Sequence, residues 1–181
     1  MRIRNDRERY GLVAVLLHWL VALTVFGLFG LGLWMTSLTY YDAWYRQGPA
    51  LHKSIGVVLF VVMLARLAWR LYSPPPAPLA SHTPLERRTA YLVHGLLYLL
   101  LFAIMASGYL ISTADGRAVE VFGLFSIPAT ITALPRQEDI AGAVHLTLAI
   151  TLMALVLLHI AGALKHHFID RDRTLKRMLG R

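Results

Sequence analysis

Residues 140–167 read IAGAVHLTLAITLMALVLLHIAGALKHH, an apolar run with histidines at positions 145 and 159 and basic residues at its end. An α-helix turns about 100° per residue, so a separation of fourteen residues brings the two histidines to within about 40° of one face. They lie about 21 Å apart along the axis, which nearly spans a hydrocarbon core of about 30 Å. A buried imidazole costs free energy unless it has a partner. Two b-type haems, one near each membrane face, would explain this spacing.

The composition of the chain is that of a membrane protein. Of 181 residues, 57% are hydrophobic and only 15% are charged, against about a quarter in soluble domains. Apolar windows at about 11–35, 51–71, 91–112 and 140–164 are each long enough to cross a bilayer as a helix. The first is too long for a signal peptide and is expected to be retained. We predict an all-α membrane protein, one domain over residues 1–181, built as a four-transmembrane-helix bundle.

The absence of cysteine limits the chemistry. It excludes disulfides, iron–sulfur clusters and covalent haem attachment through C-x-x-C-H. Histidine, with eight copies, is left as the haem ligand. Since the sequence has neither a glycine-rich phosphate loop nor paired acid and base carboxylates, hydrolytic chemistry has no support.

The net charge of +8 follows membrane topology and does not indicate nucleic acid binding. Fourteen of the 18 Lys and Arg residues lie in the N-terminal segment, around the second loop, or in the C-terminal tail. The positive-inside rule therefore predicts that both termini are cytoplasmic.

Depth along the helices predicts how the histidines pair. His18 lies about 7 residues from the cytoplasmic end of the first helix, and His159 about 6 residues from the cytoplasmic end of the fourth. These helices run antiparallel, so the two imidazoles share one depth. His52 opens the second helix on the external side, level with His145. We predict two bis-histidine sites, an inner one and an outer one.

Two arginines follow in the second helix. Arg66 is fourteen residues beyond His52, on the same face and at the inner level, with Arg70 one turn further. A buried arginine needs an anion, and a haem propionate is suitable. The alternative is that they snorkel to the interface, which fits Arg70 better. Gly56, one turn after His52, offers room for a flat macrocycle to approach.

Two further histidines have open roles. His94, near the cytoplasmic end of the third helix, could compete with His18 as a ligand, contact a propionate or quinone, or face a polar neighbour. His166 follows the fourth helix at the interface, where a quinone head group can be reached.

Three connections carry recognisable signals. Residues 73–88, SPPPAPLASHTPLERR, end the second helix sharply; His82 is expected to be solvated, and Thr83 or Ser81 to cap the next helix. The aromatic residues of loop 36–50 are typical of an interfacial belt. The apolar part of loop 113–139 is expected to lie along the external face and cover the outer haem.

Several of these motifs resemble the bacterial cytochrome b561 family of dihaem membrane proteins. They are LHW in the first helix, LHKSIG and RLAWRLYSPPP in the second, and VHLTLA and LLHIAGALKHHF in the fourth. The resemblance covers essentially the whole chain. It implies a four-helix fold in the bacterial inner membrane, two non-covalent haems b and quinone-linked electron transfer. By the same resemblance His18 and His159 ligate one haem, and His52 and His145 the other.

The resemblance also implies a specific activity. One branch of the family resembles superoxide oxidases, oxidoreductases that pass electrons from periplasmic superoxide to ubiquinone. Lys53 and Arg46, with Arg117 or Arg136, would then attract the anion. Related cytochromes instead serve as membrane-anchor subunits for a periplasmic dehydrogenase or hydrogenase, which is the alternative. A third hypothesis, a histidine-lined metal transporter, does not need histidines layered at two depths. The expected partners are membrane lipid, ubiquinone, and superoxide or a periplasmic redox protein.

Overall fold

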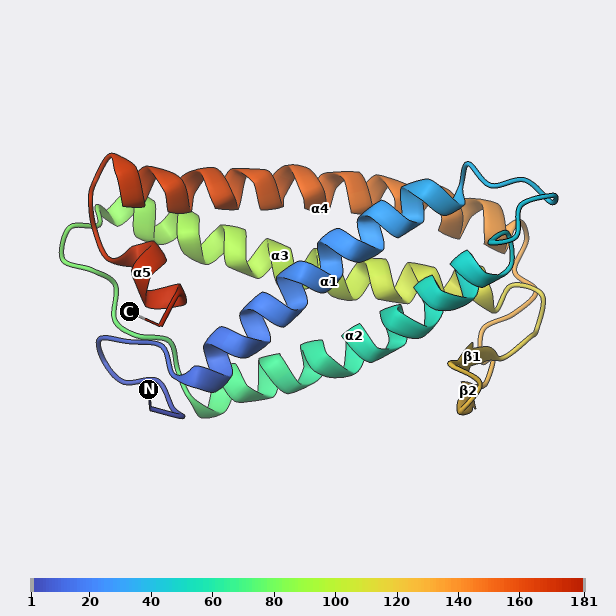
Figure 1. Cartoon of the computed structure of the whole chain (residues 1–181), viewed down its shortest axis with the longest axis horizontal. Coiled ribbons are helices and arrows are strands. Elements are labelled where there is room, and N and C mark those ends of the chain that lie inside the picture. Colours follow the sequence, from blue (N-terminus) through green and yellow to red (C-terminus); the bar gives the residue numbers. More distant parts are fainter. Residues whose placement is uncertain (1, 181) are drawn as a thin grey trace.

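Four long helices dominate the computed structural model, which describes residues 2–180 (Figure 1). They are α1 (Leu12–Met35), α2 (Gln47–Tyr72), α3 (Pro84–Ser112) and α4 (Gln137–Phe168). A short helix α5 (Thr174–Met178) and the strands β1 (Val119–Val121) and β2 (Phe125–Ile127) complete the fold. Each long helix is long and apolar enough to cross a membrane. The predicted all-helical bundle with four candidate spans is therefore confirmed.

Three of these helices extend well beyond the apolar windows that predicted them. Helix α2 begins at Gln47, α3 begins at Pro84, and α4 ends at Phe168. The start of α3 is set by a capping box, in which Thr83 accepts a hydrogen bond from the Glu86 backbone and the Glu86 side chain accepts one from Thr83. Of the two predicted caps, Thr83 is the correct one, and this box lengthens α3 with polar residues that a hydropathy window does not count.

The bundle has two distinct ends (Figure 1). Both termini, the loop 73–83 and α5 lie at one end, here called the terminal end. The loop 36–46 and the β1–β2 hairpin lie at the other, here called the hairpin end. Helix α1 packs along α2 and α3 packs along α4, while α2 also contacts α3. The fold is therefore two helical hairpins joined across the middle.

A small apolar core holds the helices together at mid-height. All four long helices contribute to it, through Val21, Val25, Leu59, Met63, Leu101 and Leu152. Many other large apolar side chains on the helices are exposed, as expected where a helix faces lipid instead of water. On α4, the core residue Leu152 lies midway between His145 and His159 in sequence. An apolar layer therefore separates the two ends of the bundle.

The loop between α3 and α4 forms a β-hairpin. Strands β1 and β2 pair antiparallel and turn through Gly123, whose φ is +69°. Val121 is fully buried, and the Phe122 backbone N–H donates to Ser54 Oγ at 3.0 Å. The segment predicted to lie along the external face thus folds as a compact β-hairpin. Because Ser54 is two residues from His52, the hairpin covers α2 close to the outer histidine level.

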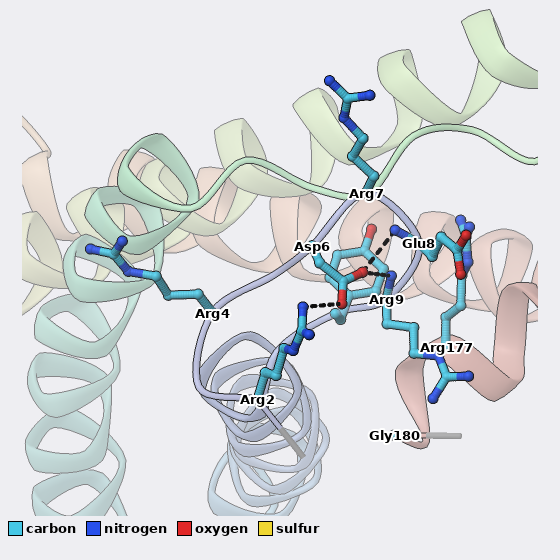
Figure 2. A pocket seen from close by; sticks show the side chains of 9 residues that line it. Arg2, Arg4, Asp6, Arg7, Glu8, Arg9, Arg177 and Gly180 are labelled. Atoms are coloured by element: carbon cyan, nitrogen blue, oxygen red, sulfur yellow. Dashed lines mark hydrogen bonds and ion pairs between the residues drawn. The ribbon is translucent and has the colours of Figure 1, made fainter.

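The N-terminal arm folds back over the terminal end. The backbone N–H of Asn5 donates to Ser73 Oγ at 3.0 Å, and its side-chain amide donates to the Ser73 carbonyl at 2.8 Å. Figure 2 shows the arginines around Asp6, which border a hollow of about 940 Å³. Backbone N–H groups of Glu8 and Arg9 hold the pKa of Asp6 below its usual range. This hollow lies over the arm and is not bordered by any histidine of the described residues.

Candidate functional site

The structure brings the four predicted ligands together as two pairs. At the inner level, the ring centroids of His18 and His159 are 6.4 Å apart. At the outer level, those of His52 and His145 are 6.1 Å apart. Each pair joins one helix of the α1–α2 hairpin to α4. The imidazoles that the depth argument paired therefore lie close together in the structure.

The spacing of both pairs fits two axial ligands on one iron. A metal–imidazole bond takes about 2 Å and the nitrogen lies about 1 Å from its ring centre, so two such rings have centroids about 6 Å apart. Neither pair has ring nitrogens in hydrogen-bond contact with each other among residues 2–180. The two rings of each pair are strongly tilted to one another, with interplanar angles of 63° and 68°. Their chemistry and spacing fit a bis-histidine haem.

The hydrogen bonds of His145 leave Nε2 as the unprotonated nitrogen, which is the tautomer that a metal ligand requires. Its Nδ1 lies 3.0 Å from the Ile104 carbonyl and 3.0 Å from Ser107 Oγ. A carbonyl only accepts, so Nδ1 carries the proton and Nε2 keeps its lone pair. A backbone acceptor on the second nitrogen is the usual way in which proteins orient ligating histidines. Residues Ile104 and Ser107 were not singled out from the sequence.

Two glycines back the outer histidines. A Cβ on Gly108 would lie 3.2 Å from His145 Cε1, and one on Gly32 would lie 3.3 Å from His52 Cε1. Both contacts are tighter than ordinary van der Waals distances, so each imidazole uses the space that glycine leaves on the neighbouring helix. A Cβ on Gly56 would meet no described atom within 4 Å. The glycines that the imidazoles contact are therefore Gly32 and Gly108.

His52 also has an unsatisfied atom. Its Nδ1 is buried and finds no hydrogen-bond partner within residues 2–180. Leaving a buried polar atom without a partner costs free energy. Such an atom is expected where the imidazole serves a group other than the chain itself.

Arg66 reaches the inner pair, as its spacing from His52 predicted. Its Nη2 donates to His18 Nδ1 at 3.1 Å, and its Nε donates to the Tyr98 hydroxyl at 3.1 Å. Arg70 lies one turn further along α2, and its guanidinium carbon is 5.9 Å from the centroid of the Tyr98 ring, as is that of Arg66. Arg66 therefore does not snorkel away from the bundle.

The bond from Arg66 to His18 constrains what the site can hold. A guanidinium only donates, so His18 Nδ1 must be the unprotonated nitrogen in this bond. A neutral His18 that ligates iron through Nε2 has its proton on Nδ1 and cannot accept there. When the iron is bound, the guanidinium therefore needs another acceptor close by, and a haem propionate is one.

His94 packs beside the inner pair. Its ring centroid is 5.3 Å from that of His159, which is shorter than the spacing of either pair. This is less than the roughly 6 Å that a shared iron requires. The geometry therefore favours His18 over His94 as the partner of His159, and leaves His94 as a neighbour of the inner level.

His82 and His166 lie in a separate cluster at the terminal end. His82 was expected to be solvated, but its side chain is only 16% exposed and its Nε2 is 3.0 Å from Asp172 Oδ2. His166 Nδ1 is 2.8 Å from Asp170 Oδ2 and 3.1 Å from Asp172 Oδ2. The prediction for His82 is wrong because the C-terminal segment folds back against the loop. His166, predicted to reach a propionate or quinone, lies beside the carboxylates of Asp170 and Asp172.

The cations predicted to attract superoxide differ in their surroundings. Arg117 pairs with Asp115 and Arg136 pairs with Asp139. Arg46 and Lys53 are exposed, and the structure gives neither an ion pair within residues 2–180. Among the described residues, Arg46 and Lys53 are therefore the two that present uncompensated positive charge at the hairpin end.

Comparison with known proteins identifies the family. A family model described as prokaryotic cytochrome b561 matches residues 9–181. The chain belongs to this family of membrane electron-transfer proteins. Family membership implies a b-type haem, which agrees with the paired histidines and their spacing.

Individual relatives cover nearly the whole chain. Cytochrome b561 homolog 2 of Escherichia coli K12 is 54% identical over 100% of this chain and 96% of its own length. The probable superoxide oxidase CybB of Yersinia pestis is 30% identical over 95% of this chain and 96% of its own length. The name of the first relative states that it is a cytochrome, whereas the name of the second states an enzymatic activity. The chain is thus similar over nearly its whole length both to a cytochrome b561 homologue and to a probable superoxide oxidase.

Proposed function

We propose that the chain binds two b-type haems and conducts electrons across the bacterial inner membrane. One observation carries this proposal: two pairs of imidazoles, at 6.4 Å and 6.1 Å between ring centroids, lie on opposite sides of an apolar core. His18 and His159 ligate the inner haem, and His52 and His145 the outer one. When bound, a bis-histidine haem b supplies one-electron transfer with no open iron position.

The surrounding residues hold and tune the two sites. Ile104 and Ser107 orient His145, while Gly108 and Gly32 leave room for the outer imidazoles. Arg66 contributes positive charge at the inner level and pairs with a propionate, with Arg70 behind it. His94 is a propionate or quinone contact at the same level. The charges of Arg66 and Arg70 are complementary to an anionic propionate at the inner level.

The distribution of Lys and Arg residues supports an orientation of the protein in the membrane and a direction of electron transfer. The Lys and Arg residues concentrated at the terminal end favour the cytoplasmic side for both termini, which makes the hairpin end periplasmic. Arg46 and Lys53 would there concentrate an anionic donor. We propose superoxide as the donor and ubiquinone as the acceptor. Two superoxide anions release two electrons and leave as O₂, and one ubiquinone takes up those electrons and two protons.

A second candidate function is a membrane anchor that exchanges electrons with a periplasmic dehydrogenase or hydrogenase. The loop 36–46 favours it, because Tyr40 and Tyr41 are 72% and 95% exposed. Exposed aromatic residues are typical of a lipid interface and of protein contacts. A stable partner that co-purifies with the chain, together with little activity toward superoxide alone, would favour this second function.

The proposed function is tested by an optical spectrum followed by an activity assay. Purified protein should contain two haems per chain and show sharp reduced α and β bands. Superoxide should then reduce the bound haem, and added ubiquinone should reoxidise it. Protein that carries two haems but ignores superoxide would favour the anchor function. Absence of a Soret band, after expression with ample haem, would contradict both.

Variants that remove one positive charge at the hairpin end test whether Lys53 attracts superoxide. Lys53→Gln should slow reduction by superoxide by about tenfold at low salt, with a weaker effect at high salt, because steering by exposed charge is screened. Arg117→Gln should change it little, since Asp115 already compensates that charge. Equal rates in both variants would remove Lys53 from the proposal.

Replacing Arg66 tests its place at the inner haem. Arg66→Ala should lower that haem's reduction potential by tens of millivolts, since a positive charge that favours the reduced state is lost. Potentiometric titration measures the change. Arg70→Ala is the control, because Arg70 makes no bond to His18 in the described structure, and its effect should be smaller. An unchanged potential in Arg66→Ala would show that Arg66 does not act on the haem.

A further inference from the structure

A second group of candidate ligands lies at the terminal end, outside the proposed haem sites. It consists of His82 from the loop 73–83, His166 from the end of α4, and Asp172 from the segment before α5. One ligand atom from each lies within 4.8 Å of the other two. Ninety residues separate His82 from Asp172, so the fold brings these side chains together.

The distances within this cluster suit a small transition-metal ion. Asp172 Oδ2 is 3.0 Å from His82 Nε2 and 3.1 Å from His166 Nδ1. Ligand atoms on a tetrahedral zinc ion, with bonds of about 2.0–2.1 Å, lie about 3.3 Å apart. Small shifts would therefore let all three atoms bind one ion. The side chains of His82, His166 and Asp172 are 16%, 15% and 8% exposed, so the cluster is largely shielded from solvent.

One nitrogen of the cluster lacks a hydrogen-bond partner, which favours the binding of a cation there. His166 Nδ1 is buried and, although close to two carboxylates, makes no hydrogen bond of acceptable geometry to any of residues 2–180. The oxygen of Asp172 thus faces two imidazole nitrogens, and only the one on His82 forms a hydrogen bond with it. A cation between these atoms would satisfy all three.

The charges around the cluster also favour a bound cation. Carboxylates of Glu86, Asp170 and Asp172 lie in or beside the cluster, and the only ammonium in contact with them is Lys165, within the part of the chain that the structure describes. Lys165 pairs with Glu86 and Asp170. These two carboxylates share one positive charge, whereas Asp172 has no Lys or Arg partner among the described residues. Asp172 is the carboxylate left for an ion.

We propose that His82, His166 and Asp172 bind one divalent transition-metal ion of the zinc type. Two imidazoles and one carboxylate are a donor set that suits zinc and disfavours calcium or magnesium, which prefer oxygen ligands. A fourth position is open to water, to the Thr174 hydroxyl, which lies 3.1 Å from His82 Nε2, or to Asp170. Binding replaces the proton shared between His82 and Asp172.

The ion would clamp the C-terminal segment onto the loop 73–83. That segment continues into α5, where the Met178 carbonyl accepts a hydrogen bond from Trp19 Nε1 at 2.8 Å. The Trp19 ring is 5.3 Å from that of His18. The clamped segment therefore covers the terminal end next to the inner histidine pair. Loss of the ion should loosen this cover without removing either haem.

Equilibrium dialysis with zinc chloride tests the site. Haem-loaded protein without a histidine tag is stripped with EDTA, dialysed against zinc, and analysed for metal per chain. We expect one zinc per chain, bound at least about tenfold more weakly in His82→Gln and Asp172→Asn. His167→Gln is the control, because it alters the neighbouring histidine outside the cluster, and should bind as wild type. The Soret spectrum checks that each variant is assembled.

Limited trypsin digestion gives a second readout that needs no variant. Cleavage after Arg171 and Arg173 should be several-fold slower with zinc than with EDTA in the wild-type protein, since a clamped segment opens less often. Failure of the wild-type protein to retain zinc would overturn the proposal. So would zinc affinity unchanged in both cluster variants, which would indicate binding elsewhere on the chain.

Discussion

Replacing His145 with alanine is expected to remove the outer haem and leave the inner one, which halves the haem per chain. A bis-histidine iron that loses one axial ligand binds much more weakly, and the Ile104 carbonyl and Ser107 hydroxyl that orient His145 lose their partner as well. Haem per chain, measured as the pyridine complex, should fall from two to one. His52→Ala should give the same result, and His18→Ala and His159→Ala should instead remove the inner haem.

His167→Ala is the control for these variants. It removes a histidine from the same helix, outside both pairs, and should keep two haems. Redox titration then distinguishes the levels, since variants of one pair should retain the same single potential. Retention of two haems in any of the four ligand variants would overturn the assignment of that histidine.

Changing Gly108 to valine should also empty the outer site, although Gly108 carries no ligand atom. A Cβ at this position already lies 3.2 Å from His145 Cε1 and 3.5 Å from Nδ1, and a branched side chain adds two more carbons. His145 must then move, which breaks its bond to the Ile104 carbonyl. Overpacking of this kind costs about 1–3 kcal/mol. We expect loss of most of the outer haem, measured as haem per chain.

Gly95→Val is the matched control, because it makes the same change on the same helix. A Cβ on Gly95 would meet no described atom within 4 Å. This variant should retain both haems. Full haem content in Gly108→Val would show that His145 can move aside without losing its ligand role.

The pairing of the histidines could be predicted because depth is a linear function of position along a helix. Each residue adds about 1.5 Å of rise, so His18 and His159 can be placed at one level, and His52 and His145 at another, without knowing how the helices pack. The same arithmetic placed Arg66 at the inner level, where it bonds to His18. That these histidines ligate haem stays a prediction, supported by family membership and by their spacing.

Contacts between side chains on neighbouring helices could not be predicted in the same way. They depend on the rotation of each helix about its axis and on which helices are neighbours. The sequence drew attention to Gly56, whereas the imidazoles lie against Gly32 and Gly108. Nothing in the order of residues indicates that Ser107 lies beside His145. The small pair Ser107–Gly108 in an otherwise bulky helix was the only signal available.

The sequence by itself determined the number of membrane-length helices, the absence of thiolate chemistry, and the two levels of the paired histidines. Each follows from composition or from rise per residue, which are local properties. Only the tertiary structure decided that loop 113–136 folds as a β-hairpin over Ser54, and that His82 meets His166 and Asp172. These contacts join segments tens of residues apart. Their formation depends on how the loops close over the ends of the bundle, which no local pattern specifies.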